Sequence, residues 1–188
     1  GVSGHGVRSS LLTIFLRQVV RGMKTAAADP IIVLAQIIKD YKALNIDEEH
    51  YISLLYGVYN SKTKGLTMMN AGHNCLPIVM ENKGGKGVKI TELDIRGLPV
   101  CSLINAPNHE VKTLQMEKGD KILLYTDGIT EAVNSNNKVF GTERLKNIIS
   151  EMGIADGKKL AEGIINEARK FAGGSPMDDM AVLVLELL

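Results

Sequence analysis

The segment YISLLYGVYNSKTKGLTMMNAGHN, residues 51–74, contains two strand-like runs around one short polar turn. The turn, residues 61–65, ends in a glycine, which supplies the backbone angles that tight turns need. Apolar and aromatic runs bounded by such turns are typical of β-hairpins. The stretch therefore predicts antiparallel strands in the middle of the chain.

The same plan recurs twice further along the chain. Residues 77–93 place PIVMEN and VKITEL on either side of KGGKG, and residues 109–128 place HEVKTLQM and KILLYTDG on either side of EKGD. Each segment predicts a further hairpin. The middle of the protein is thus expected to consist of three successive hairpins.

Helical patterns flank these strands. In residues 7–24 the apolar side chains recur at helical spacing, and Asp29 followed by Pro30 is typical of an N-cap that starts a second helix through about Leu44. Towards the C-terminus, Thr142 is expected to cap a helix over 143–152. An apolar stripe predicts another helix over 158–172, formed by Leu160, Ile164, Ile165 and Ala168. Residues 180–188 then form a strongly apolar strand, so the class is α+β, in one domain.

Composition excludes several kinds of protein. The 188 residues include 22 Lys and Arg against 21 Asp and Glu, a balance that predicts no binding to nucleic acid. Cys75 and Cys101 lie far apart, so no disulfide scaffold or zinc site is expected. The apolar runs are too short to span a bilayer and no secretory signal is visible, which favours the cytoplasm. A membrane-anchored parent protein stays compatible with this pattern.

Carboxylates stand at the ends of two apolar strands. Asp127 follows residues 121–125, and Asp178 and Asp179 precede residues 180–188. Read alone, each site is typical of a solvated turn or a helix cap. Taken together, they suggest a site for Mg²⁺ or Mn²⁺, which prefer carboxylate oxygen and water as ligands. The spacing along the chain does not show whether the two sites meet.

The strand that ends at NAGHN, residues 70–74, has a polar end with Asn70 and His73. Such an end is typical of a turn that tolerates a histidine. It is also typical of a loop that carries function. Both interpretations stay open from the residues alone.

Five motifs occur in one order along almost the whole chain. Together they resemble the bacterial metal-dependent serine/threonine phosphatases of the RsbU and SpoIIE type, a branch of the type 2C protein phosphatases. The motifs are VSGHG at 2–6, NAGHN at 70–74, YTDGITE at 125–131, FGTERL at 140–145 and MDDMAVLVLEL at 177–187.

The resemblance implies a four-layer α-β-β-α sandwich with two antiparallel sheets flanked by helices, over residues 1–188. It implies hydrolysis of phosphoserine or phosphothreonine on a partner, typically a STAS-domain anti-anti-sigma factor, by a metal-activated water. Two Mn²⁺ or Mg²⁺ ions would lower the pKa of that water and stabilise the phosphate oxygens. An upstream sensor or receiver domain would control the activity.

The resemblance also implies roles for individual residues. Asp127, Asp178 and the backbone carbonyl of Val2 would bind metal, and His5 would be a general acid. Gly128 would allow the backbone to pass close beside the metal carboxylate. Further support for the site is expected from Asp179, Gly4, Gly6, Asn70 and His73.

One position departs from the family pattern. The family has an aspartate that bridges both metals before Val-Ser-Gly-His-Gly, and this chain has Gly1 there. The family's preceding strands are also absent, so we expect an N-terminally truncated domain with weak metal binding and impaired turnover. Neighbouring strands would then lack partners, which suggests association into a homodimer.

Two other functions compete with this interpretation. The first is a non-catalytic pseudophosphatase that serves as a protein-interaction or dimerisation module. The second is a nucleotide-binding domain, which is disfavoured because the opening glycines lack the Gly-Lys-Ser/Thr ending of a P-loop.

Overall fold

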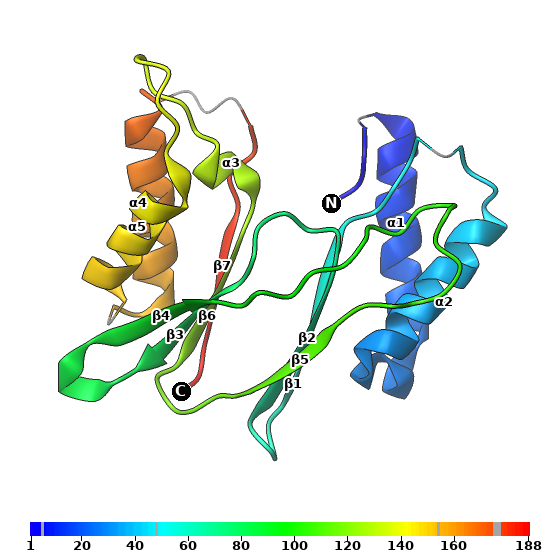
Figure 1. Ribbon diagram of the computed structural model, residues 1–188, viewed down its shortest axis with the longest axis horizontal. Coiled ribbons are helices and arrows are strands. Elements are labelled where there is room, and N and C mark those ends of the chain that lie inside the picture. Colours follow the sequence, from blue (N-terminus) through cyan, green and yellow to red (C-terminus); the bar gives the residue numbers. More distant parts are fainter. Residues whose placement is uncertain (5, 48, 154, 175–177) are drawn as a thin grey trace. The chain divides into compact units, whose positions relative to one another are not determined.

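The computed structural model describes residues 1–4, 6–47, 49–153, 155–174 and 178–188. Contacts within the chain divide it into two compact units. Unit 1 comprises Gly1–His73 and Ile95–Gln115, and unit 2 comprises Asn74–Asp94 and Met116–Leu188. Each unit has its own antiparallel sheet and helices (Figure 1). Each also has its own apolar core.

Unit 1 contains a three-stranded sheet in the order β1-β2-β5, formed by Leu54–Asn60, Gly65–Ala71 and Val111–Gln115. Strands β1 and β2 pair antiparallel over their full length, from Leu54 opposite Ala71 to Asn60 opposite Gly65. The hairpin predicted from residues 51–74 is therefore confirmed. Nearly all of β2 is buried, because it lies between two partners and beneath a helix.

Two helices cover this sheet. Helix α1 spans Val7–Gly22 and α2 spans Pro30–Ala43, with a short 3-10 helix, Lys24–Ala28, between them. The carboxylate of Asp29 accepts hydrogen bonds from the backbone N–H of Ile31 at 2.8 Å and of Ile32 at 3.3 Å, which confirms the predicted cap. Helix α2 packs on β1 and β2, and α1 packs on α2 (Figure 1).

Unit 2 contains a four-stranded sheet in the order β4-β3-β6-β7. Strands β3 and β4, Ile78–Asn82 and Val88–Glu92, form the second predicted hairpin, whose turn holds the 3-10 helix Gly84–Lys86. Strand β6, Lys121–Tyr125, pairs with β3 on one side and with β7, Val182–Glu186, on the other. This central position explains why its apolar run is almost unbroken.

The helices of unit 2 are α3 (Asp127–Thr130), α4 (Gly141–Met152) and α5 (Gly157–Phe171). Helix α4 packs on β4 and α5 packs on β7 (Figure 1). In the predicted stripe of α5, Ile165 is partly buried and the other three side chains are fully buried: Leu160, Ile164 and Ala168. The predicted cap at Thr142 is wrong. Phe140 occupies the N-cap without a side-chain bond, and Thr142 is hydrogen-bonded to Tyr125 instead.

A largely buried ion pair joins the two neighbouring strands β6 and β7. The ammonium of Lys121 lies 3.3 Å from the carboxylate of Glu186 and donates to the backbone carbonyl of Gly153. The same carboxylate accepts a hydrogen bond of 2.8 Å from the backbone N–H of Gly157. The pair therefore fixes the loop between α4 and α5 to the sheet.

The third predicted hairpin is wrong. Strand β5 pairs with β2 in unit 1, whereas β6 belongs to the sheet of unit 2. The side chains of β5 alternate in exposure, as in a strand at the edge of a sheet, but those of β6 are buried almost throughout. The buried carboxylate of Asp120 accepts hydrogen bonds from the backbone of Asn82 and Glu117, so the turn is attached to β3 rather than folding back on β5.

The observed class is α+β with two antiparallel sheets, as predicted. Both cysteines are free thiols, with Cys75 buried and Cys101 half-buried. Among the helices that the structure describes, none has the length and apolar character to cross a membrane.

Candidate metal site

The Asp127 motif lies where β6 ends and α3 begins. Asp127 is the first residue of α3, and its side chain is partly buried. Its carboxylate accepts a hydrogen bond of 3.1 Å from the backbone N–H of Gly128. Among the described residues no other group donates to this carboxylate, which leaves most of its oxygen lone pairs available.

Thr126 connects this turn to the segment that carries Asp178 and Asp179. Its hydroxyl donates to the backbone carbonyl of Asp179 and accepts from the backbone N–H of Ala181, both at 2.9 Å. Its own N–H donates to the carbonyl of Ala181 at 3.1 Å. Two segments far apart in the sequence therefore lie side by side, a contact that their spacing along the chain does not reveal.

The approach of the two segments leaves no room for a side chain at Gly128. A Cβ placed there would lie 2.4 Å from the backbone oxygen of Asp179 and 3.4 Å from the carbonyl carbon of Asp178. Contacts this short do not occur between real Cβ atoms and backbone oxygens. The glycine thus permits the close packing of the two aspartate segments.

Asp178 and Asp179 are exposed. Asp178 accepts a hydrogen bond of 2.7 Å from the backbone N–H of Asp179, the residue after it, as Asp127 does from Gly128. Carboxylates held by one neighbouring N–H each suit a hard divalent cation that keeps several water ligands. Within the described residues, no group of three His, Cys, Asp or Glu side chains is arranged to hold a metal ion.

The surroundings of Asp127 on its inner side are apolar. Burial raises the pKa of the Cys75 thiol to about 11, and the negative charges of Asp127 and Glu131 add to this effect. Burial likewise raises the pKa of Tyr125 to about 12. Both groups are therefore neutral at physiological pH, and the Asp127 carboxylate stands at the edge of a region of low polarity.

In unit 1 the opening segment is held by an isolated β-bridge. Val2 pairs antiparallel with Ile52, flanked by hydrogen bonds from Ser53 N–H to the carbonyl of Gly1 at 2.9 Å and from Ser3 N–H to the carbonyl of Tyr51 at 3.0 Å. In such a pair the hydrogen bonds fall on the flanking residues. The carbonyl of Val2 accepts no hydrogen bond from any residue that the structure describes.

The glycines of the opening motif have conformations that favour glycine. Gly4 has a φ of 77° and Gly6 a φ of 87°, and Gly6 is the N-cap of α1. His5, the predicted general acid, lies outside the described residues.

The NAGHN turn of unit 1 is tied together by the buried amide of Asn70. This amide donates to the carbonyls of His73 at 2.9 Å and Ile95 at 3.0 Å, and it accepts from the N–H of His73 at 2.8 Å. Gly72, with a φ of 78°, packs so closely on Pro99 that a Cβ would lie 2.6 Å from it. The Asn70 amide thus attaches the turn to the segment that begins at Ile95.

The structure therefore brings four predicted site residues together in unit 2: Asp127, Gly128, Asp178 and Asp179. Val2, Gly4, Gly6, Asn70 and His73 belong to unit 1. The role of Thr126 was not predicted from the sequence. A threonine between a buried strand and Asp-Gly offers no spacing signal, because its two partners lie more than 50 residues away in the chain.

Comparisons with known proteins identify the family and the fold. The family described as Stage II sporulation protein E (SpoIIE) matches residues 1–188. The phosphoserine phosphatase RsbU of Bacillus subtilis is 23% identical over 187 residues, which cover 98% of this chain and 53% of that protein. The chain thus spans about half the length of this curated relative.

Solved structures share the fold. The RsbU and RsbW domains of Rv1364c from Mycobacterium tuberculosis match with a TM-score of 0.76 and 19% identity, covering 98% of this chain and 49% of that one. The SiaA-PP2C domain of Pseudomonas aeruginosa matches with a TM-score of 0.77 and 16% identity, and the match covers 99% of this chain and 73% of that one. Because the family match extends over every residue, this chain belongs to the SpoIIE family.

Proposed function

We propose that this chain is the phosphatase domain of a protein that removes phosphate from phosphoserine or phosphothreonine on a partner protein. The observation that carries the proposal is the hydroxyl of Thr126, which holds the Asp127 turn against the Asp178–Asp179 segment. Family membership and the name of the relative RsbU, a phosphoserine phosphatase, support it.

The donor set fits a divalent cation. In unit 2, Asp127 and Asp178 would hold Mn²⁺ or Mg²⁺, because both carboxylates offer oxygen atoms with free lone pairs. In unit 1, the carbonyl of Val2, which accepts no hydrogen bond from the described residues, stays a predicted metal ligand. A SpoIIE phosphatase domain from Bacillus subtilis presoaked with Mn and RsbX in complex with magnesium support these two metals. Such cations lower the pKa of water and stabilise negative charge on phosphate oxygens.

The other residues of the site would position the metal ligands or transfer a proton. Asp179 fixes Asp178 through its backbone N–H, and the absence of a side chain at Gly128 lets both segments approach. In unit 1, Asn70 stabilises the NAGHN turn, and His5 would give a proton to the leaving seryl oxygen. For the substrate we propose a phosphorylated STAS-domain protein, and for the assembly a homodimer.

The test is metal-dependent release of phosphate from p-nitrophenyl phosphate and from a phosphoserine STAS protein. Mn²⁺ should activate and EDTA should abolish turnover. Asp127→Asn and Asp178→Asn should each reduce it by at least about 100-fold, since each removes a charged ligand. Asp40→Asn, a carboxylate of α2 in unit 1, is the matched control and should leave turnover unchanged.

The rival function, a pseudophosphatase, is favoured by Gly1, which stands where the family has an aspartate. Calorimetric titration with Mn²⁺ separates the two functions. A phosphatase domain binds the cation through Asp127 and Asp178, and binding is lost in both variants. If neither this chain nor its Gly1→Asp variant binds Mn²⁺ or turns over substrate, the proposed phosphatase activity is wrong.

A further inference from the structure

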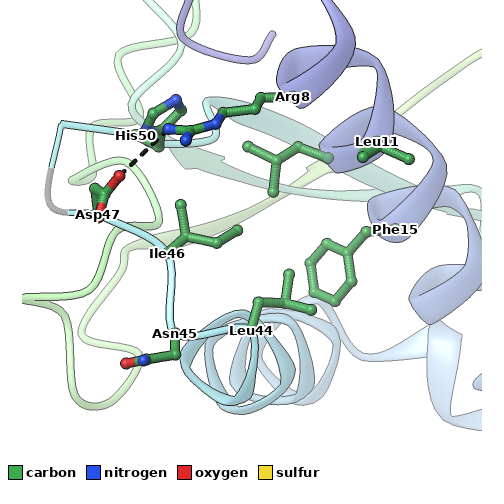
Figure 2. A pocket seen from close by; sticks show the side chains of 9 residues that line it. Arg8, Leu11, Phe15, Leu44, Asn45, Ile46, Asp47 and His50 are labelled. Carbon is green, nitrogen blue, oxygen red and sulfur yellow. Dashed lines mark hydrogen bonds and ion pairs between the residues drawn. The ribbon is translucent and has the colours of Figure 1, made fainter.

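Unit 1 contains a cavity of about 470 Å³ between α1 and the segment that follows α2 (Figure 2). This volume lies within the range of small-molecule sites in proteins. All of its lining residues belong to unit 1, outside the proposed metal site.

The body of the cavity is apolar. Leu12 is buried, and Phe15 contacts Tyr41 of α2 edge to face, with 6.5 Å between the ring centroids. Leu11 and Leu44 also line the cavity, and they are 60% and 44% exposed, respectively. Large apolar side chains exposed around a concave surface are typical of a binding site.

One end of the cavity is polar. Arg8 and Asp47 form an ion pair across it through a single contact of 3.3 Å, and both side chains are more than two-thirds exposed (Figure 2). Exposed pairs of this kind contribute little to stability, so either partner can turn towards a ligand. His50 lines the same end, and its buried Nδ1 has no hydrogen-bond partner among the described residues.

We propose that this cavity binds a small uncharged amphipathic molecule. An aromatic or branched body would cover Leu11 and Leu44, and one hydrogen-bonding group would reach the polar end. The ligand should be neutral because the charges of Arg8 and Asp47 already compensate each other. A charged ligand would bring an uncompensated charge into a cavity whose body is apolar.

Both sides of the cavity are connected to the opening motif. Ser9, next to Arg8, donates a hydrogen bond of 3.0 Å to the carbonyl of Ser3. On the other side, the backbone carbonyl of Tyr51, the residue after His50, accepts a hydrogen bond from the backbone N–H of Ser3. The backbone N–H of Tyr51 donates to the hydroxyl of Ser3 at 2.8 Å. A ligand that holds the two sides together should therefore stabilise the hydrogen bonds of Ser3.

The test is a titration followed by methyl NMR, with 4-methylphenol as the probe and 4-methylbenzoate and 4-methylbenzylamine as its charged counterparts. We expect saturable shifts of the Leu12 and Leu44 methyl signals, with the phenol binding at least about fivefold more tightly than either ion. At ten times Kd, hydrogen exchange of the Ser3 and Tyr51 amides should slow by up to about tenfold.

A pair of variants locates the binding. Leu44→Trp fills the cavity and should weaken binding of the phenol at least about tenfold, whereas Ile32→Trp, on an equally exposed position of α2 outside the cavity, should not. Equal binding of all three probes, equal affinity in the two variants, or unchanged exchange at both amides would overturn the proposal.

Discussion

The hydroxyl of Thr126 donates a hydrogen bond of 2.9 Å to the backbone carbonyl of Asp179. It also accepts a hydrogen bond from the backbone N–H of Ala181. A single side chain therefore satisfies two backbone groups in the segment that leads into β7. Because Asp127 is the next residue, this oxygen sets the separation between the two carboxylate segments. Thr126 is therefore the residue on which the proposed metal site depends most directly.

Thr126→Val keeps the shape of the side chain and removes both hydrogen bonds. We expect a loss of about 1–2 kcal/mol in the free energy of unfolding and a 10–100-fold weaker affinity for Mn²⁺. Urea denaturation and calorimetry measure the two effects. Thr126→Ser retains the hydroxyl and should keep most of the stability and most of the Mn²⁺ affinity. An unchanged Mn²⁺ affinity in the valine variant would contradict the assignment.

Gly128→Ala places a methyl group 2.4 Å from the backbone oxygen of Asp179. Since backbone cannot yield as a flexible side chain does, we expect a destabilisation of about 1–3 kcal/mol and a loss of Mn²⁺ binding. Gly85→Ala is the control, because a Cβ there meets no atom of the described residues within 4 Å. If the two alanine variants have the same thermal stability, the close approach of Gly128 to the backbone of Asp179 is not important in solution.

Gly1→Asp restores a carboxylate at the position where the family has one. Among the described residues, a Cβ at this position meets only the hydroxyl of Ser53, at 2.7 Å, and that side chain can rotate away. We expect Mn²⁺ affinity to rise at least about tenfold, with little change in thermal stability. Calorimetry with Gly1→Asn, which has the same size and no charge, shows whether the charge is responsible.

Glu186→Gln tests the buried ion pair with Lys121, whose side chain is 4% exposed. The amide oxygen of Gln can still accept from Gly157, so the change isolates the charge. We expect a loss of up to about 3 kcal/mol in the free energy of unfolding, because Lys121 keeps a buried charge without its partner.

The control is Glu162→Gln, which removes the exposed pair with Lys158 on α5. Its expected cost is below about 0.5 kcal/mol. Chemical denaturation of both variants gives the comparison, and equal costs would show that the Lys121 pair contributes no more than a surface pair.

Asp156 predicts a pH dependence of stability. The backbone N–H and the ammonium of Lys159 hydrogen-bond to this N-cap carboxylate of α5 and lower its pKa below the ordinary 3.8. The ionised group therefore stabilises the fold above that ordinary value, and the effect is lost as pH falls through the lowered pKa. Asp156→Asn keeps the cap without the charge.

Melting curves between pH 2 and 7 measure this effect. The wild-type protein should melt at a higher temperature than Asp156→Asn above about pH 4, and the difference should shrink as the carboxyl group is protonated. A difference that stays constant down to pH 2 would show that the charge of Asp156 does not contribute.

Local patterns of the sequence were enough for most elements. The glycine-ended turn at 61–65 predicted β1 and β2, and the Asp29 cap predicted the start of α2. Each of these features depends on residues only a few positions apart in the sequence. The apolar spacing of α5 predicted its buried stripe for the same reason. Motif order along the chain also led to the family, since it does not depend on the three-dimensional arrangement.

The α+β class, the family and the two aspartate motifs could all be read from local residue patterns and their order along the chain. The placement of β5 and β6 in different sheets became visible only in three dimensions, since strands that follow a turn can pair with any compatible edge. The same holds for the contact by which Thr126 joins Asp127 to Asp179, across 53 residues. Such contacts arise from packing of distant segments, and no local spacing encodes them.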